Sequence, residues 1–207
     1  MQKKAAEAAT FVKQCARRLG TIATLGRQTP DQPVRVFCQD ESRFGLHLPI
    51  RRRVTGYGVK PLQIVEPLYE AYWLYAAVAP TTGDAFWWEL PRLDATCFSL
   101  FLNKFGQHYA ESLNIILLDQ APAHIAHRGQ LPENVVLVWL PAYSPELNPV
   151  ERLWEDLKAR IDVLDARVRS SLSALQEHVA GLVQRYSAET IASLTGYAYL
   201  TEAIYAL

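Results

Sequence analysis

Two short, uninterrupted apolar runs constrain the fold of this chain more than any other feature. Residues 114–119 read NIILLD, and residues 135–140 read VVLVWL. Runs of this length and composition are typical of strands buried on both faces, so each face of the sheet must be covered by helices. The chain order, with aromatic strands first, then alternating helices and strands, then helices alone, predicts an α/β protein with a mixed sheet flanked by helices.

The other elements follow from periodicity and turn residues. The turn sequence QTPDQP places a domain boundary near Pro30, which separates an N-terminal helical appendage and linker (1–30) from a main domain (31–207). Asp94 is the expected N-cap of a helix that follows it. The predicted elements are a helix over 1–25, a strand over 34–40 with a hairpin partner at 44–48, strands over 71–79 and 85–90, and helices over 147–161 and 170–185, with shorter helical pieces to residue 207.

Composition excludes several classes of protein. No apolar run approaches the roughly 18 residues of a membrane span, and the Lys- and Ala-rich N-terminus is unlike a secretory signal. Three scattered cysteines fit reduced thiols, so we expect a cytoplasmic protein. The 21 basic and 21 acidic residues balance to zero net charge, which argues against a protein that mainly coats nucleic acid.

Three carboxylates occupy positions where ligands bind in α/β folds. Asp40 and Asp119 end predicted strands, and Glu151 lies in the first turn of a predicted helix. Convergent carboxylates stay ionised only if a cation neutralises them, and oxygen ligands select Mg²⁺ or Mn²⁺. Two such ions about 3.5–4 Å apart would clamp the attacking and leaving oxygens of a phosphodiester.

Each acid also has a simpler interpretation. Asp40 and Asp119 fit acids that begin a turn after a strand, and Glu151 fits a capping signature with Asn148 as N-cap and Pro149 at the first helical position. The sequence leaves both interpretations open for each residue taken alone.

Three blocks of sequence resemble the motifs of DDE transposases, and of the mariner-like and bacterial insertion-sequence superfamily in particular. They are QDES at 39–42, LDQAPAH at 118–124 and LPAYSPELNPVERLWEDLK at 140–158. The resemblance implies a ribonuclease-H-like fold, with Asp40, Asp119 and Glu151 as the catalytic, metal-binding triad. It also implies metal-dependent DNA cleavage and strand transfer, with DNA and a second copy of the chain as partners. Gln120 departs from the Asn that is common at its position.

Two histidines follow the second acid. His124 is expected either to support the site from behind or to face a DNA phosphate, and His127 is expected at the surface. A zinc hydrolase that uses both histidines is a third interpretation, although no further nitrogen or thiol ligand lies nearby.

Basic residues cluster after the first acid, without an acidic residue among them. Such cations contact phosphates and read no base sequence, so they predict DNA binding, with a solvated hairpin rim as the alternative. The predicted DNA contacts are Arg43, Arg51, Arg52, Arg53, Lys60 and His124. The aromatic residues of the strands at 71–79 and 85–90, and Trp154, are expected in the core and not on a base-stacking surface.

The resemblance also predicts a missing part. Related transposases carry helix-turn-helix modules ahead of the catalytic domain, and about thirty residues precede it here. We therefore expect a catalytic domain that lacks its own end-recognition module, with a separately encoded DNA-binding half as a further partner. The alternatives are a general metal-dependent nuclease of the same fold and a catalytically silent remnant that binds DNA or a transposase and regulates it.

Overall fold

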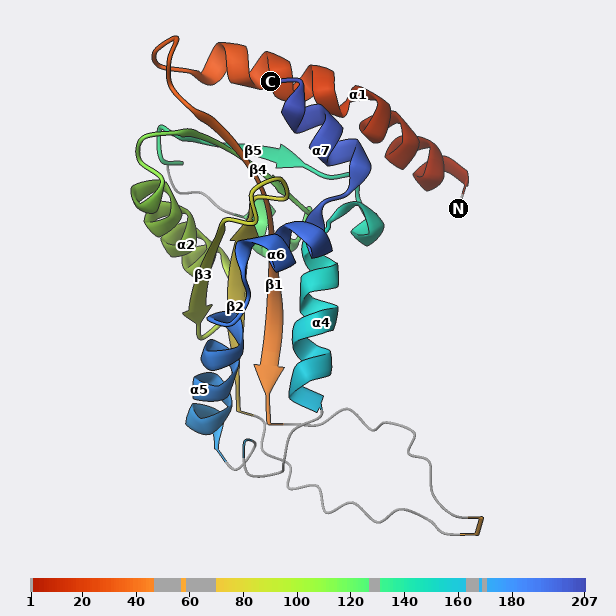
Figure 1. The fold of residues 1–207 in the computed structure, drawn as a ribbon, viewed down its shortest axis with the longest axis vertical. Helices are drawn as coiled ribbons and strands as arrows, with labels where there is room; N and C mark the ends of the chain where they lie inside the picture. The colour runs from red at the N-terminus through yellow and green to blue at the C-terminus, as the bar shows by residue number, and fades with distance from the viewer. Residues whose placement is uncertain (1, 47–56, 59–69, 127–130, 163–167, 169–170) are drawn as a thin grey trace.

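A five-stranded mixed sheet forms the centre of the molecule (Figure 1). The structure, a computed structural model, describes residues 2–46, 57–58, 70–126, 131–162, 168 and 171–207. The strand order is β3-β2-β1-β4-β5. β1 pairs antiparallel with β2 and parallel with β4. The strands are β1 (Val34–Gly45), β2 (Ala71–Val78), β3 (Ala85–Leu90), β4 (Leu113–Leu118) and β5 (Val135–Trp139).

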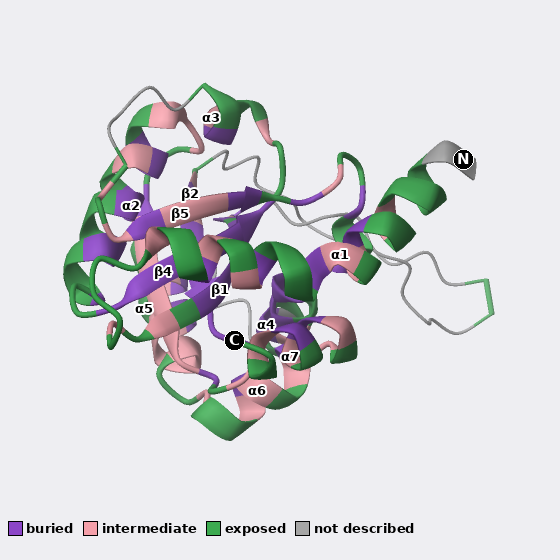
Figure 2. Cartoon of the chain, turned by 90° about the horizontal axis from the view of Figure 1, so that it is seen from above, coloured by how far each residue is buried: buried purple, intermediate pink, exposed green. Residues whose placement is uncertain are grey.

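Helices cover both faces of this sheet. One face packs against α2, and the other against α1, α4, α5, α6 and α7, which gives two hydrophobic clusters separated by the sheet. Figure 2 shows the buried residues in the strands and on the inward sides of the helices. The helices are α1 (Gln2–Gly26), α2 (Ala95–His108), α3 (Pro122–Ile125), α4 (Val150–Asp162), α5 (Leu172–Val183), α6 (Ala188–Thr195) and α7 (Ala198–Tyr205).

The prediction of a mixed sheet flanked by helices is confirmed. The six residues of β4 are all buried, as the apolar run predicts. The Asp94 side chain caps α2 by accepting a hydrogen bond from the backbone N–H of Cys97. Of the aromatic strand residues expected in the core, Tyr72 and Tyr75 are buried there, and Trp73, Phe86, Trp87 and Trp88 are half-buried and pack against it.

The prediction of two short strands around Asp40 is wrong. β1 continues without a break from Val34 to Gly45, and its antiparallel partner is β2 rather than the segment 44–48. What ends near Asp40 is the pairing with β4, whose last partners are Cys38 and Leu117. Asp40 therefore lies in the middle of a long strand, because β2 still pairs with β1 after β4 has ended.

The start of the third-motif helix is also later than predicted. A short 3₁₀ turn covers Pro145–Leu147, and the backbone of Asn148 is extended (φ −93°, ψ 106°) before α4 begins at Val150. A residue that precedes proline is sterically excluded from the helical region, and Pro149 follows Asn148. The helix therefore begins after the proline.

The N-terminal helix α1 shares the core of the main domain. Phe11, Cys15 and Leu19, which recur at helical spacing, are each at most 3% exposed and belong to the cluster that covers the sheet. The boundary near Pro30 stays a prediction. No helix in the described ranges is long and apolar enough to cross a membrane. The predicted basic residues Arg51, Arg52, Arg53 and Lys60 and the predicted surface residue His127 lie outside the described residues.

Candidate active site

The parallel pairing of β1 with β4 brings the first two acids together. In this pairing Val34 lies opposite Leu113 and Cys38 opposite Leu117. The same register carried two residues further places Asp40 level with Asp119, which directly follows β4. Alternate residues of a strand share a face, and Val36 and Cys38 are buried under the helices of the α4 side. Asp40 therefore emerges on the face that α4 covers.

The segment before α4 attaches the third acid to the same place. The side-chain amide of Asn148, buried to 3% exposure, donates a hydrogen bond to the Gln39 carbonyl at 2.9 Å. Its oxygen accepts from the backbone N–H of Val150 at 3.2 Å, so Asn148 is the helix cap, as predicted. This attachment places Glu151, one residue into α4, next to the strand that carries Asp40.

Glu151 does not complete a reciprocal capping box. In such a box the acid accepts a hydrogen bond from the backbone N–H of the cap residue. Here the N–H of Asn148 donates to the Pro145 carbonyl at 2.8 Å, and Glu151 is exposed. The capping interpretation therefore holds for Asn148 and leaves the carboxylate of Glu151 free for another role.

The electrostatics of Asp40 show that the acids converge. Burial raises the pKa of the Asp40 carboxyl well above its usual range, and the charges of Glu41, Glu151 and Asp119 raise it further. Glu151 and Asp119 therefore each lie within electrostatic range of Asp40, joined by a fourth acid, Glu41, that the sequence analysis did not single out. Convergent acids of this kind are a common mark of a functional site.

The Trp154 indole holds the Asp40 carboxylate from behind. Trp154 is 2% exposed and packs edge-on against Trp87, as expected of a core residue. Its Nε1–H also donates a hydrogen bond to Asp40 Oδ2 at 3.0 Å, which the sequence analysis missed. This contact orients the first acid from the helix that carries the third.

Replacing Trp154 with phenylalanine is expected to separate the two roles of this residue. The Trp154→Phe side chain keeps most of the packing but loses the N–H, so we expect DNA cleavage to fall by about 10–100-fold, the usual effect of removing a group that orients a ligand. Trp88→Phe is the matched control, because it shortens an indole that packs on the other face of the sheet, away from Trp154 and Asp40. Equal cleavage by both variants in a plasmid-nicking assay would show that the indole hydrogen bond is dispensable.

A buried histidine bridges two of the acids. His124 Nδ1 lies 2.9 Å from Asp119 Oδ1, and Nε2 lies 2.9 Å from Glu41 Oε1. Burial opposes protonation of the ring, but the hydrogen bonds to Asp119 and Glu41 prevail and raise the pKa of His124 to about 10. The bond from His124 is the main reason why the pKa of Asp119 is lowered. Both ring nitrogens are engaged, so the geometry supports the first of the two expected roles, support from behind.

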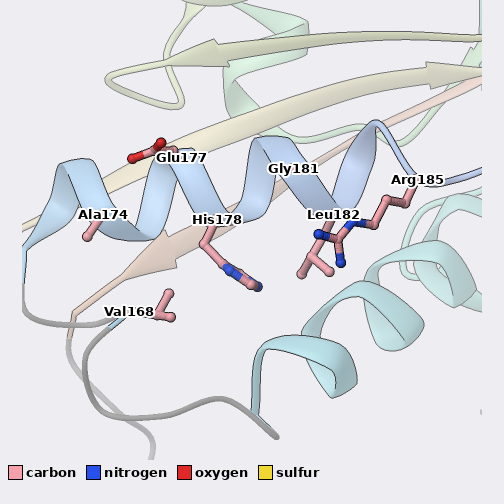
Figure 3. A pocket seen from close by; sticks show the side chains of 7 residues that line it. All are labelled: Val168, Ala174, Glu177, His178, Gly181, Leu182 and Arg185. Carbon is pink, nitrogen blue, oxygen red and sulfur yellow. The ribbon is translucent and has the colours of Figure 1, made fainter.

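Two hollows in the surface differ in their position relative to the motif residues. One of about 690 Å³ is bounded by Arg18 of α1, by Trp139 and by Gln120, the residue after Asp119. Another, of about 420 Å³, runs along α5 beside His178 and Arg185 and contains none of the site acids (Figure 3). The first hollow is not lined by a site acid either, but it borders Gln120, which directly follows Asp119. Among the predicted DNA contacts, Arg43 is exposed on β1.

The donors at this site fit a hard cation. Asp40, Asp119 and Glu151 offer carboxylate oxygens only, the ligands that Mg²⁺ and Mn²⁺ prefer. A cation would also relieve the repulsion that raises the Asp40 pKa. Across the parts of the chain that the structure describes, no three His, Cys, Asp or Glu side chains are close enough together to enclose an ion.

Comparison with known proteins places the chain in a family. Residues 35–173 match the family described as DDE superfamily endonuclease. The chain belongs to this family. The match contains all three motif blocks, and the prediction of a DDE transposase catalytic domain is confirmed. A relative from Sinorhizobium fredii (strain NBRC 101917 / NGR234), named uncharacterized protein y4pE/y4sA, is 32% identical over 87 residues, which are 42% of this chain and 64% of the relative.

Solved structures with the same fold are complexes of the Mos1 mariner transposase. The Mos1 paired-end complex with Mn matches with a TM-score of 0.65 and 16% identity, over 96% of this DDE domain and 60% of the Mos1 chain. The Mos1 strand transfer complex matches with a TM-score of 0.59 and 16% identity, over 94% and 61% of the two chains. The expected ribonuclease-H-like fold is thereby confirmed. The chain spans about three-fifths of the Mos1 chain.

Proposed function

We propose that this DDE domain cleaves phosphodiester bonds at transposon ends and joins the cleaved DNA to a target, with Mg²⁺ or Mn²⁺ as cofactor. The observation that carries this proposal is the position of Asp119 and Glu151 beside the largely buried Asp40, whose pKa is raised by burial and further by their charges. Without a bound cation, the repulsion between these carboxylates would only destabilise the folded protein. Membership of the DDE endonuclease family and the fold shared with Mos1 support the same chemistry.

In the proposed mechanism the three acids share one task. Asp40, Asp119 and Glu151 would hold two divalent ions, which would supply an activated water and neutralise charge at the scissile phosphate. A bond forms between the water oxygen and phosphorus while the bond from phosphorus to the 3′ oxygen breaks, which frees a 3′-hydroxyl. That hydroxyl then attacks a target phosphate and releases the target's own 3′-hydroxyl. Trp154 and His124 keep Asp40 and Asp119 in place.

DNA is the proposed partner, and exposed cations lie where it would approach. Arg18 borders the hollow beside Gln120, Arg17 lines a neighbouring hollow, and Arg43 is exposed on β1. Guanidinium groups position phosphates without reading sequence. We propose that two copies of the chain act together on paired ends.

The test is cleavage and joining by the purified protein. With Mn²⁺ it is expected to nick supercoiled plasmid, and EDTA is expected to abolish nicking. A labelled end fragment with a free 3′-hydroxyl is then expected to become joined to plasmid. Nicking without joining would favour a general nuclease of this fold. Binding of DNA without any cleavage in Mn²⁺ or Mg²⁺ would contradict the proposal and favour the catalytically silent regulator.

A further inference from the structure

A chain of hydrogen bonds connects all three sequence motifs beneath the site. It starts at Asn148, before α4, whose amide donates to the Gln39 carbonyl. The Gln39 side-chain amide donates to Glu41 Oε1 at 2.8 Å. Glu41 accepts from His124 Nε2 at 2.9 Å, and His124 Nδ1 contacts Asp119 Oδ1 at 2.9 Å. The second acid is thus tied, through β1, to the segment that carries the third.

This chain is closed to solvent except at its last member. The side chains of Glu41 and His124 are 3% and 1% exposed, whereas that of Asp119 is 56% exposed. The ring of Phe98 lies 4.4 Å from the His124 ring and restricts its movement. Burying a charged pair is costly, and replacing such a pair with apolar residues is often neutral or stabilising. The pair is therefore poorly explained as a device for stability alone.

The contacts leave one oxygen of Asp119 free. Oδ1 accepts from the backbone N–H of Ala121 at 2.9 Å and contacts His124. Among the described residues no hydrogen bond to Oδ2 is found. Both bonds to Oδ1 fix the rotation of the carboxylate, and this rotation decides where Oδ2 points.

We propose that Glu41 and His124 are positioning residues, which hold the Asp119 carboxylate so that its free oxygen faces the metal site. The expected effect on metal binding rests on the proposed function, whereas the orientation of the Asp119 carboxylate does not. Glu41 fixes the ring through Nε2, and the ring fixes Asp119 through Nδ1. Groups that orient a metal ligand in this way typically change metal affinity or activity by about 10–100-fold.

Two amide substitutions of His124 separate positioning from packing. In His124→Asn the amide nitrogen takes the place of Nδ1 and keeps the contact with Asp119. In His124→Gln the amide nitrogen takes the place of Nε2 and keeps the contact with Glu41 instead. Each variant retains one of the two hydrogen bonds. Both variants lose the imidazolium beside the buried Glu41, so we expect both to lose stability in urea unfolding but to affect the site differently.

Binding of Mn²⁺ is the primary readout, measured by calorimetry without DNA. The His124→Asn variant, which loses only the contact with Glu41, is expected to bind Mn²⁺ slightly more weakly than the wild type, and the His124→Gln variant about 10–100-fold more weakly. In cleavage assays the loss for His124→Gln is expected in kcat and not in KM for DNA. His108→Gln, on the exposed side of α2, is the matched control and is expected to leave Mn²⁺ affinity unchanged.

Equal Mn²⁺ affinities for the Asn and Gln variants would overturn the inference. A crystal structure of the His124→Gln variant gives a second test, because the Asp119 carboxylate is expected to turn, and an unchanged orientation counts against positioning. Should both variants fail to fold, Glu41→Gln is measured in their place, because its amide keeps an oxygen for His124. We expect it to lose less Mn²⁺ affinity than is expected for His124→Gln. An unchanged Mn²⁺ affinity would contradict the role of Glu41. A wild-type protein that cleaves no DNA would end the proposed function alone, since the orientation of Asp119 is measured independently.

Discussion

Replacing Asp40 with asparagine is expected to abolish DNA cleavage and to stabilise the fold at the same time. The Asp40→Asn amide retains an oxygen for the Trp154 indole but loses the charge that a cation requires. Metal ions contribute several kcal/mol to phosphodiester cleavage, so the rate is expected to fall on the order of 10²–10⁴-fold. Plasmid nicking in Mn²⁺ measures this loss.

The gain in stability comes from the same charge. Burial, together with Glu41, Glu151 and Asp119, raises the pKa of Asp40 in the folded protein, so the ionised carboxylate opposes folding. We expect the free energy of unfolding of the variant to be about 0.5–2 kcal/mol higher than that of the wild type at neutral pH, which is the range of single stabilising substitutions. This advantage is expected to grow as pH rises through the folded-state pKa of Asp40 and to vanish below pH of about 4, where the carboxyl is protonated in both states.

Urea unfolding in EDTA at several pH values measures this second effect. Asp31→Asn is the control, because it makes the same change at an exposed acid in the turn before β1. It is expected to alter neither the rate of plasmid nicking nor the free energy of unfolding. A destabilised Asp40→Asn protein would contradict the electrostatic account of the site, whereas full nicking by this variant would exclude Asp40 from catalysis.

Removing the buried imidazole is expected to have the largest effect on stability. In His124→Leu the Glu41 carboxylate keeps the Gln39 amide but loses its cationic partner. Breaking a buried ion pair from one side typically lowers the free energy of unfolding by about 3–5 kcal/mol, because an uncompensated charge remains in the core. Urea unfolding of the metal-free protein measures this loss.

A double substitution separates the lost partner from the lost packing. In the protein with both Glu41→Leu and His124→Leu no unpaired charge is left inside, so we expect it to be more stable than His124→Leu alone. His108→Leu, at an exposed position of α2, is the control for replacing a histidine with leucine. Additive losses in the double variant would show that Glu41 and His124 do not act as a pair.

Much of the fold follows from patterns in the chain itself. The apolar run before Asp119 predicts a doubly buried strand, and β4 is buried throughout. The helical stripe of Phe11, Cys15 and Leu19 and the cap at Asp94 are likewise local signals, and the structure contains both. These predictions succeed because each depends on residues a few positions apart. The three motif blocks also sufficed to predict the DDE family, since the third block is long and specific.

Predictions that depend on pairing between distant segments failed. The local sequence after Asp40 resembles a turn followed by a hairpin partner, yet β1 continues to Gly45 because β2, about thirty residues later, pairs with it. The start of α4 moved for a more local reason, the proline after Asn148. Glu41 passed unnoticed because a glutamate after an aspartate carries no signal until the sheet directs the two side chains to opposite faces.

The sequence alone determined which residues carry charge and which segments must be buried. Only the tertiary structure decided what those charges meet: Asp40 meets an indole from α4, and Asp119 meets an imidazole that a third carboxylate holds from behind. The physical reason is that electrostatic interactions depend on distance in space and on exclusion of water. Both quantities are set by how the strands and helices pack, because residues far apart in the chain become neighbours only in the folded sheet.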